Sequence, residues 1–203
     1  MFRNLFILAL FVFASCNFST HENASNNENL AATDSTDKDR EVIEPISIDT
    51  VLIGDLNSDR IQDTAFITTP PVIKYLDKND SLKFYGDCLN GNCFNRISFS
   101  SGLAEIYNDN SIWGSLENLG DLNKDGFSEL IFSPSWFIGC RGPLFVYYYN
   151  GKDWNIAGRV DYYRCNDDAL ATHVRKVKGK YFLFGTTNVD GDEVESRVEL
   201  KMK

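Results

Sequence analysis

The side chains best suited to chemistry are oxygen donors that alternate along a short loop in the second half of the chain. Counted from Asp121, they stand at loop positions 1, 3, 5 and 9, and Gly126 stands at position 6. A hard cation such as calcium takes roughly six to eight oxygens, which a short loop supplies when alternate side chains turn inward and a glycine makes the sharp turn. Position 7 offers its backbone carbonyl. The spacing predicts a calcium site with the ligands Asp121, Asn123, Asp125, Phe127 and Glu129.

The sequence that follows this loop favours a strand. In the helical calcium-binding hand a glutamate at position 12 closes the site, but position 12 here is Phe132. The run Leu130-Ile131-Phe132 is apolar and typical of a strand. We therefore expect a calcium loop between two strands.

A second copy of the pattern begins 66 residues earlier, at Asp55. Residues 54–66 and 120–132 share Gly, Asp, Leu, Asn, Asp and the closing Phe, and self-similarity at a fixed period indicates a repeat architecture. The corresponding ligands are Asp55, Asn57, Asp59, Ile61 and Asp63. A third, degenerate candidate at residues 188–196 keeps oxygen donors at Asn188, Asp190 and Asp192, with Glu193 in place of the glycine and Ser196 in place of the last acid.

These stretches resemble the FG-GAP/VCBS repeat family, whose members build β-propeller blades around a D-x-N/D-x-D-G-x-x-D/E calcium loop, as in integrin heads and many bacterial surface proteins. The resemblance covers about a dozen residues at each loop. The second loop follows the pattern with Glu129 at its last position, and the first has Arg60 where the family has glycine. A non-glycine residue in the left-handed conformation costs roughly 1 kcal/mol, which a bound cation can offset.

A metal-free interpretation of the loops stays open at this point. Each of the first two loops carries three carboxylates and an asparagine. Like charges so close together repel strongly unless a cation neutralises them. Asp and Asn also hydrogen-bond to their own backbone in metal-free Asx turns. Calcium is the expected cofactor, with a structural role, and an Asx-turn loop is the alternative.

The N-terminus has the features of a lipoprotein export signal. Residues 1–15 hold one charge and an apolar run too short to span a bilayer, which is typical of a secretory signal peptide. Phe13-Ala14-Ser15-Cys16 resembles a bacterial lipobox, which implies that Cys16 is lipidated and becomes the mature N-terminus. The alternative is an ordinary signal that leaves Cys16 free. Acyl chains anchor a protein to a membrane without spanning it, and we expect the outer membrane, on its periplasmic face or at the cell surface.

The rest of the chain divides into a tether and a β domain. Residues 16–44 are rich in Asn, Ser, Thr, Asp and Glu and are predicted to be a disordered tether. Residues 45–203 read as short strands with turn signals, and predict an all-β domain of antiparallel, blade-like sheets of β-propeller-repeat type. They are too few for a full propeller. We expect a monomeric open sandwich or partial propeller; a ring completed by other copies is the alternative.

The expected elements follow from apolar runs and turn residues. Asn150-Gly151 and Lys178-Gly179 predict hairpin turns, and residues 167–174 fit one short helix. The expected strands are Ile46–Ile53, Thr64–Thr69, Leu82–Tyr85, Ile97–Ser100, Ile112–Leu119, Glu129–Phe132, Leu144–Tyr149, Trp154–Tyr162, Tyr181–Gly185 and Val194–Leu200.

The cysteine count predicts two disulfides. With Cys16 lipidated, four cysteines remain in an exported domain. If Asn90-Gly91 forms a two-residue hairpin turn, Cys88 faces Cys93 across a ladder at about 4.5 Å between Cα atoms. Cys140 and Cys165 then pair across the next hairpin. The other connectivities stay open, and metal binding by the cysteines is disfavoured because no CxxC spacing occurs.

Charge and motifs favour a binding protein. A net charge of −9 repels nucleic acid. Apart from His173 the β domain has no histidine, and the chain contains no common catalytic motif. Aromatic residues between Trp136 and Tyr163 could form a contact patch, although alternation places about half of them in the core.

We expect a lipid-anchored module that binds an unknown protein or glycan. The alternatives are an envelope enzyme or enzyme accessory acting on glycans, and a purely structural envelope protein.

Overall fold

The structure of the chain is a computed structural model that describes residues 40–91, 93–136, 139–165 and 168–202. These residues belong to a compact unit that runs from Asp37 to Lys203. The predicted signal peptide, the lipidation site Cys16 and most of the predicted tether lie outside the described residues. None of the helical segments within the described residues has the length and apolar character needed to cross a membrane.

The described residues form an all-β fold, as the sequence predicts. Helical structure among them is limited to the short 3-10 segments η1 (Leu89–Gly91) and η2 (Leu170–His173), the second standing where the sequence predicts a helix. The strands are β1 (Arg40–Glu44), β2 (Ser47–Gly54), β3 (Asp63–Thr69), β4 (Val72–Leu76), β5 (Leu82–Cys88), β6 (Phe94–Phe99), β7 (Ile106–Asp109), β8 (Trp113–Gly120), β9 (Glu129–Ser135), β10 (Arg141–Tyr149), β11 (Trp154–Tyr163), β12 (Val174–Val177), β13 (Lys180–Val189) and β14 (Asp192–Glu199).

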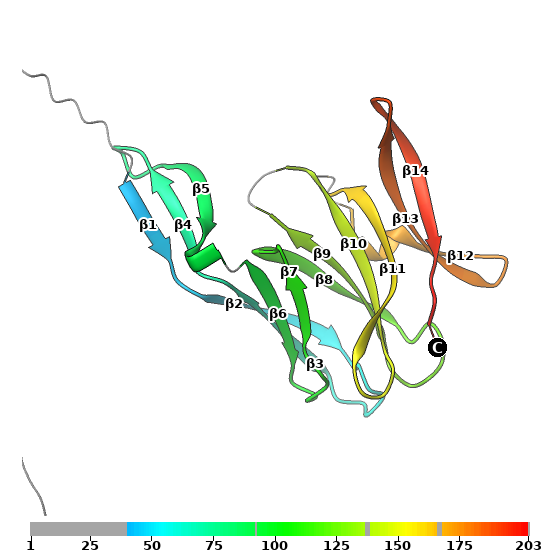
Figure 1. Cartoon of the computed structure of the whole chain (residues 1–203). Helices are drawn as coiled ribbons and strands as arrows, with labels where there is room; N and C mark the ends of the chain where they lie inside the picture. The colour runs from blue at the N-terminus through cyan, green and yellow to red at the C-terminus, as the bar shows by residue number, and fades with distance from the viewer. Residues whose placement is uncertain (1–39, 92, 137–138, 166–167, 203) are drawn as a thin grey trace, which may run out of the picture. The chain divides into compact units, whose positions relative to one another are not determined.

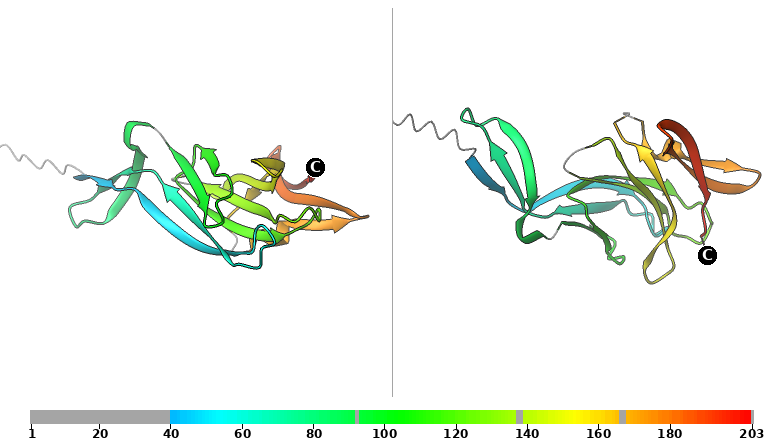
Figure 2. Two further views of the ribbon diagram at one scale, coloured as in Figure 1. Left: turned by 90° about the horizontal axis from the view of Figure 1, so that it is seen from below. Right: turned by 45° about the horizontal axis from the view of Figure 1, so that its top comes forward.

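The strands make four antiparallel sheets (Figure 1, Figure 2). The N-terminal sheet has the order β1-β4-β5, and the C-terminal sheet has the order β12-β13-β14. Between them in sequence lie the loop-1 sheet, β2-β3-β6-β7, and the loop-2 sheet, β8-β9-β10-β11. These sheets close neither a barrel nor a full propeller within the part of the chain described, in agreement with the open arrangement expected from the sequence.

The loop-2 sheet is buried on both faces. Along β9, Leu130 and Phe132 pack into a core shared with the loop-1 sheet, while Ile131 packs into a core shared with the C-terminal sheet. This follows from strand alternation, which sends successive side chains to opposite faces. Full burial of each such side chain contributes about 1.5–3 kcal/mol. Gly114 in β8 makes room for Phe132, because a Cβ there would lie 2.3 Å from the ring.

The repeat offset seen in the sequence also appears in the strand bounds. β8 and β9 begin and end 66 residues after β2 and β3. The register irregularities match as well, since one lies between Leu52 and Gly54 and the other between Asn118 and Gly120. Loop 1 (residues 55–62) and loop 2 (residues 121–128) are therefore the connections between equivalent strand pairs.

Several elements differ from the sequence prediction. β1 lies within the segment predicted as disordered tether, where it pairs with β4 and where Glu44 makes an ion pair with Lys74 at 2.6 Å. Strands β4, β7 and β12 have no counterpart among the expected strands. Each is short, and β7 and β12 are half polar. All three are paired with a neighbouring strand.

The degenerate third candidate, residues 188–196, is an ordinary hairpin. Val189 pairs with Asp192 across Asp190-Gly191, whose φ angles are 52° and 96°. Positive φ at both central residues is the two-residue turn that suits the twist of a β-hairpin. The connection is therefore too short to form a nine-position loop. The turn predicted at Lys178-Gly179 has the same form, with φ of 49° and 84°.

Both predicted disulfides are present, but one arises differently from the expectation. Cys88 and Cys93 are bonded with Cα atoms 5.3 Å apart, and Cys140 and Cys165 with Cα atoms 5.1 Å apart. The expected β5–β6 hairpin is wrong, because β5 belongs to the N-terminal sheet and β6 to the loop-1 sheet. The first disulfide thus joins two sheets. The second closes the open end of the β10–β11 hairpin, as expected.

Candidate metal centre

Loop 2 is wrapped around the carboxylate of Asp121. Its Oδ1 accepts hydrogen bonds from the backbone N–H of Lys124 at 2.6 Å and of Asp125 at 3.1 Å, and its Oδ2 accepts from Gly126 at 2.9 Å. Gly126 has φ of 95°, the left-handed conformation that glycine adopts without strain. The position-1 carboxylate therefore organises the turn that its neighbours follow.

The next oxygen donors are linked to one another. Asn123 Oδ1 accepts from the backbone N–H of Asp125 at 3.0 Å, and Asn123 Nδ2 donates to Asp125 Oδ2 at 2.8 Å. Asp125 Oδ1 accepts from the backbone N–H of Phe127 at 2.9 Å. These contacts gather positions 1, 3 and 5 in one loop. They are also the bonds of a metal-free Asx turn, so alone they do not separate the two interpretations.

Glu129, at position 9, provides an observation that the Asx-turn bonds do not. Its side chain is 1% exposed, and its Oε2 accepts from the backbone N–H of Leu122 at 2.6 Å. Its Oε1 is buried without a hydrogen-bond partner in the part of the chain described. Burial, with the charges of Asp125 and Asp121 adding to it, raises the pKa of Glu129 to about 7. A buried carboxylate oxygen that lacks a partner is costly. The carboxylates of Asp121, Asp125 and Glu129 do not all converge within 4.8 Å of one another in the described residues, but these residue types are the oxygen set that a hard cation takes. The residues of loop 2 therefore fit calcium.

Loop 1 reproduces these bonds 66 residues earlier. Asp55 accepts from the backbone N–H of Asp59 at 3.2 Å and of Arg60 at 2.8 Å, and Asn57 Nδ2 donates to Asp59 Oδ2 at 3.0 Å. The Ile61 N–H donates to Asp59 Oδ1 at 2.7 Å. Arg60 has φ of 70°, so it occupies the left-handed position that Gly126 fills in loop 2.

The loops differ at position 9. Asp63 is 2% exposed, and its Oδ2 accepts from the backbone N–H of Leu56 at 2.9 Å, matching the Leu122–Glu129 bond. Its other oxygen, Oδ1, accepts from the Ser100 hydroxyl at 3.2 Å. Both carboxylate oxygens of Asp63 therefore have protein donors, whereas one oxygen of Glu129 has none among the described residues.

The two loops touch each other, which the sequence did not reveal. Ser58 Oγ donates to the Gly126 carbonyl at 2.8 Å, and the Ser128 N–H donates to the Leu56 carbonyl at 2.9 Å. Ser128 Oγ also donates to the Asp55 carbonyl at 3.1 Å. In the sequence these two serines stand between expected ligands, and nothing marks them as contacts. The contact depends on how the loop-1 and loop-2 sheets pack.

The position-7 residues have different surroundings. Phe127 packs against Tyr149 with ring centres 5.0 Å apart, while Ile61 is 65% exposed. Loop 2 is therefore braced by the β10–β11 hairpin at the position whose carbonyl is an expected ligand. Loop 1 has no such brace from a ring contact in the described residues.

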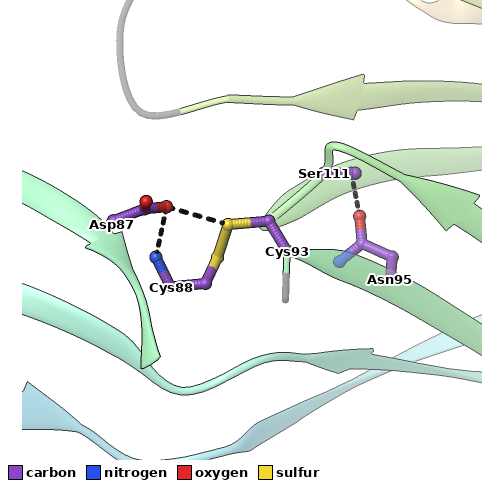
Figure 3. Close-up of a disulfide and its surroundings, with 5 residues drawn as sticks. All are labelled: Asp87, Cys88, Cys93, Asn95 and Ser111. Atoms are coloured by element: carbon purple, nitrogen blue, oxygen red, sulfur yellow. Dashed lines mark hydrogen bonds between the residues drawn. A yellow bond between two sulfur atoms is a disulfide. The ribbon is translucent and has the colours of Figure 1, made fainter. Parts of the chain in front are cut away.

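A further cluster of acidic and sulfur side chains is not a metal site. Asp87, Cys88 and Cys93 lie close together (Figure 3). The disulfide between the two cysteines leaves no thiolate to bind a metal. The Asp87 carboxylate instead accepts from the Cys88 N–H at 2.7 Å. His173, the histidine of the β domain, has its Nδ1 3.1 Å from the Phe184 carbonyl and its ring 5.2 Å from that of Tyr162.

Comparisons of the chain with protein-family models, with curated proteins and with solved structures found no match. The interpretation of the site therefore depends on its own geometry.

Proposed function

We propose that the chain is an exported lipoprotein, held on the outer membrane by Cys16, whose β domain is stabilised by calcium and acts as a binding module. The N-terminal sequence supports the anchor, and the loop pattern and its resemblance to FG-GAP/VCBS repeats support calcium. The expected role of the ion is structural, because the loops connect strands that pack two sheets together.

The observation that carries the calcium part is Glu129 Oε1. It is a buried carboxylate oxygen without a protein donor in the described part of the chain, in a loop whose other donors are Asp121, Asn123 and Asp125. A cation would neutralise the three carboxylates and supply the missing partner of Glu129. The Phe127 carbonyl is the backbone donor at position 7. The same offset and bonds make Asp55, Asn57, Asp59, Ile61 and Asp63 the candidates in loop 1.

Thermal unfolding with and without calcium tests this proposal. The sample is a fragment that begins at Asp37, with both disulfides intact, in excess calcium or excess chelator. At calcium 100 times above Kd, one site adds about 2.7 kcal/mol, which is a rise in Tm of roughly 5–10 °C for a domain of this size. The Asp121→Ala/Asp125→Ala variant should lose most of that rise. Asp192→Ala, in the two-residue turn region, is the matched control and should keep it.

Superimposable melts at millimolar calcium would show that the loops are metal-free Asx turns. The calcium-stabilised binding module would then be the wrong proposal. Mass spectrometry of the mature N-terminus tests the anchor separately, since a diacylated Cys16 is expected and a Cys16→Ser variant should be released from membranes.

The proposal describes a binding protein rather than an enzyme. His173 contacts a backbone carbonyl and a tyrosine ring. Hydrolysis of an envelope glycan panel by the purified protein would favour the enzymatic alternative.

A further inference from the structure

A cavity of about 450 Å³ lies between the edge strand β7 and the β10–β11 hairpin. Its volume is in the range of small-molecule sites, about 300–1,000 Å³. Its described lining comes from β7, the end of β9, β10 and β11, so it is separate from the ligands of loops 1 and 2. The lining includes Tyr107, Asn108, Trp136, Phe145, Arg159 and Arg164.

The cavity gathers positive charge on an acidic protein. Three of the chain's nine arginines line it, and the single described lining acid is Asp109. Of these arginines, Arg141 is ion-paired with Glu193, which leaves Arg159 and Arg164 as the cations to consider. Arg164 is held by two neutral acceptors: its Nη1 donates to the Pro134 carbonyl at 2.9 Å and its Nε to the Gly139 carbonyl at 3.0 Å. Those bonds fix the guanidinium without cancelling its charge. A guanidinium fork matches a carboxylate in geometry.

Arg159 is the more available cation. It is 60% exposed, and its contact with Asp161 is 3.7 Å long. Ion pairs between exposed groups contribute little, so this one competes weakly with an incoming anion. The guanidinium carbon lies 5.7 Å from the centre of the Phe145 ring, which holds the charge beside an aromatic wall.

Aromatic side chains line the same cavity as these polar groups. Tyr107 is 62% exposed and Trp136 is 38% exposed, while Phe145 is half-buried. Large flat rings at the solvent boundary provide apolar contact area at little conformational cost. Such faces suit the C–H surface of a sugar ring, whose hydroxyls then reach the polar groups between them.

Asn108 is a mostly buried member of the cavity lining. The residue is 6% exposed, and its Oδ1 accepts from the Tyr147 hydroxyl at 2.6 Å. This bond ties the β7 side of the cavity to β10.

We propose that this cavity binds a carboxylate-bearing saccharide, with the acid on Arg159 and Arg164 and a ring face on Tyr107. The inference rests on the proposed binding function and assigns its ligand to a chemical class. A lining that combines aromatic rings with arginines fits a compact, oxygen-rich ligand better than a long apolar chain.

Titration calorimetry of the calcium-loaded protein, with the Cys16→Ser change for solubility, tests the proposal. The probes are trigalacturonate and a hyaluronan tetrasaccharide, with galactotriose as the neutral match and Ala-Ala-Tyr as a peptide carboxylate. An acidic saccharide should bind at least tenfold more tightly than galactotriose. Arg159→Gln and Tyr107→Ala should each weaken that binding at least fivefold, and Arg175→Gln, on the C-terminal sheet, should leave it unchanged.

Thermal melts of each variant confirm that a loss of binding is not a loss of folding. Equal binding of acidic and neutral saccharides, no binding of either acidic saccharide, tighter binding of the peptide, or unchanged binding by both cavity variants would each overturn the proposal. A calcium-dependent Tm without saccharide binding would overturn the ligand assignment and leave the calcium module standing. Saccharide binding without an effect of calcium on Tm would overturn the calcium module and leave the ligand assignment standing.

Discussion

Loop 1 and loop 2 lie between strands with equivalent bounds and have corresponding hydrogen bonds, yet the last acid of each loop has different hydrogen-bond partners. In loop 1 the shorter Asp63 has both oxygens bound by Leu56 and Ser100. In loop 2 the longer Glu129 has one oxygen bound by Leu122 and one left without a donor among the described residues. One scaffold thus carries a carboxylate satisfied by the protein and a carboxylate with one oxygen that has no donor among the described residues. Equal spacing in sequence does not mean equal hydrogen bonding of the last acid.

The largest expected effect is on the pH dependence of the metal-free protein. The folded-state pKa of Glu129, about 7, lies above its ordinary value of 4.5. The folded state therefore holds this proton where the unfolded state has lost it, and stability falls as pH rises from about 4.5 to about 7. The loss reaches at most about 3 kcal/mol. Urea unfolding in chelator at pH 5 and pH 8 should show a flatter dependence for Glu129→Gln than for the wild type. Equal slopes in Glu129→Gln and wild type would contradict this account.

The next effect is on calcium stabilisation itself. Glu129→Gln removes the carboxylate that lacks a protein donor and should lose roughly 2 kcal/mol of the calcium-dependent gain. Asp63→Asn should lose less than about 1 kcal/mol, because its oxygens already have donors. Thermal melts in calcium and in chelator measure both variants. A larger loss in Asp63→Asn would reverse the comparison and make loop 1 the principal site.

Position 6 provides a smaller, reciprocal test. Arg60 and Gly126 hold equivalent left-handed conformations, and a side chain there costs roughly 1 kcal/mol. Gly126→Arg should lose about 1 kcal/mol of metal-free stability, while Arg60→Gly should gain somewhat less, since glycine also gives the unfolded chain more freedom. Denaturant unfolding in chelator measures both. Destabilisation by Arg60→Gly would mean that the Arg60 side chain stabilises the loop in another way.

The smallest effect concerns communication between the loops. Ser58 and Ser128 carry the side-chain bonds between them, each worth about 0.5–1.5 kcal/mol. Calcium titration should show that Asp121→Ala lowers the calcium affinity of loop 1 by a few-fold. In the Ser58→Ala/Ser128→Ala background, Asp121→Ala should lower that affinity by less. Additive behaviour of Asp121→Ala and Asp55→Ala in both backgrounds would show that the loops act independently.

The sequence predicted the loops because their chemistry is local. The positions of Asp121, Asn123 and Asp125, and the left-handed residue after them, are all set within a few residues of chain. The same holds for the Lys178-Gly179 turn. The disulfide pairs followed from arithmetic and proximity, although the hairpin proposed for Cys88 and Cys93 was wrong.

Features that depend on packing could not be predicted in this way. That Glu129 Oε1 has no donor among the described residues, and that Ser100 lies beside Asp63, depends on which strand lies next to each loop. The third loop was predicted from spacing alone, but the pairing of Val189 with Asp192 leaves only a two-residue turn there. The cavity is built by Tyr107 and Arg159 from distant strands, and no short motif records it.

The disulfide between Cys140 and Cys165 also bears on when the chain becomes competent to bind. These cysteines are the immediate neighbours of Arg141 and Arg164, and the Arg164 N–H donates to the Cys140 carbonyl at 2.7 Å. Closing a loop of this length stabilises the fold by about 3 kcal/mol. In a reducing cytosol the thiols stay apart, so two of the cavity's cations would not be held in place. If the chain is exported and binds a ligand as proposed, the newly made protein would gain its affinity only after export, once the disulfide has formed.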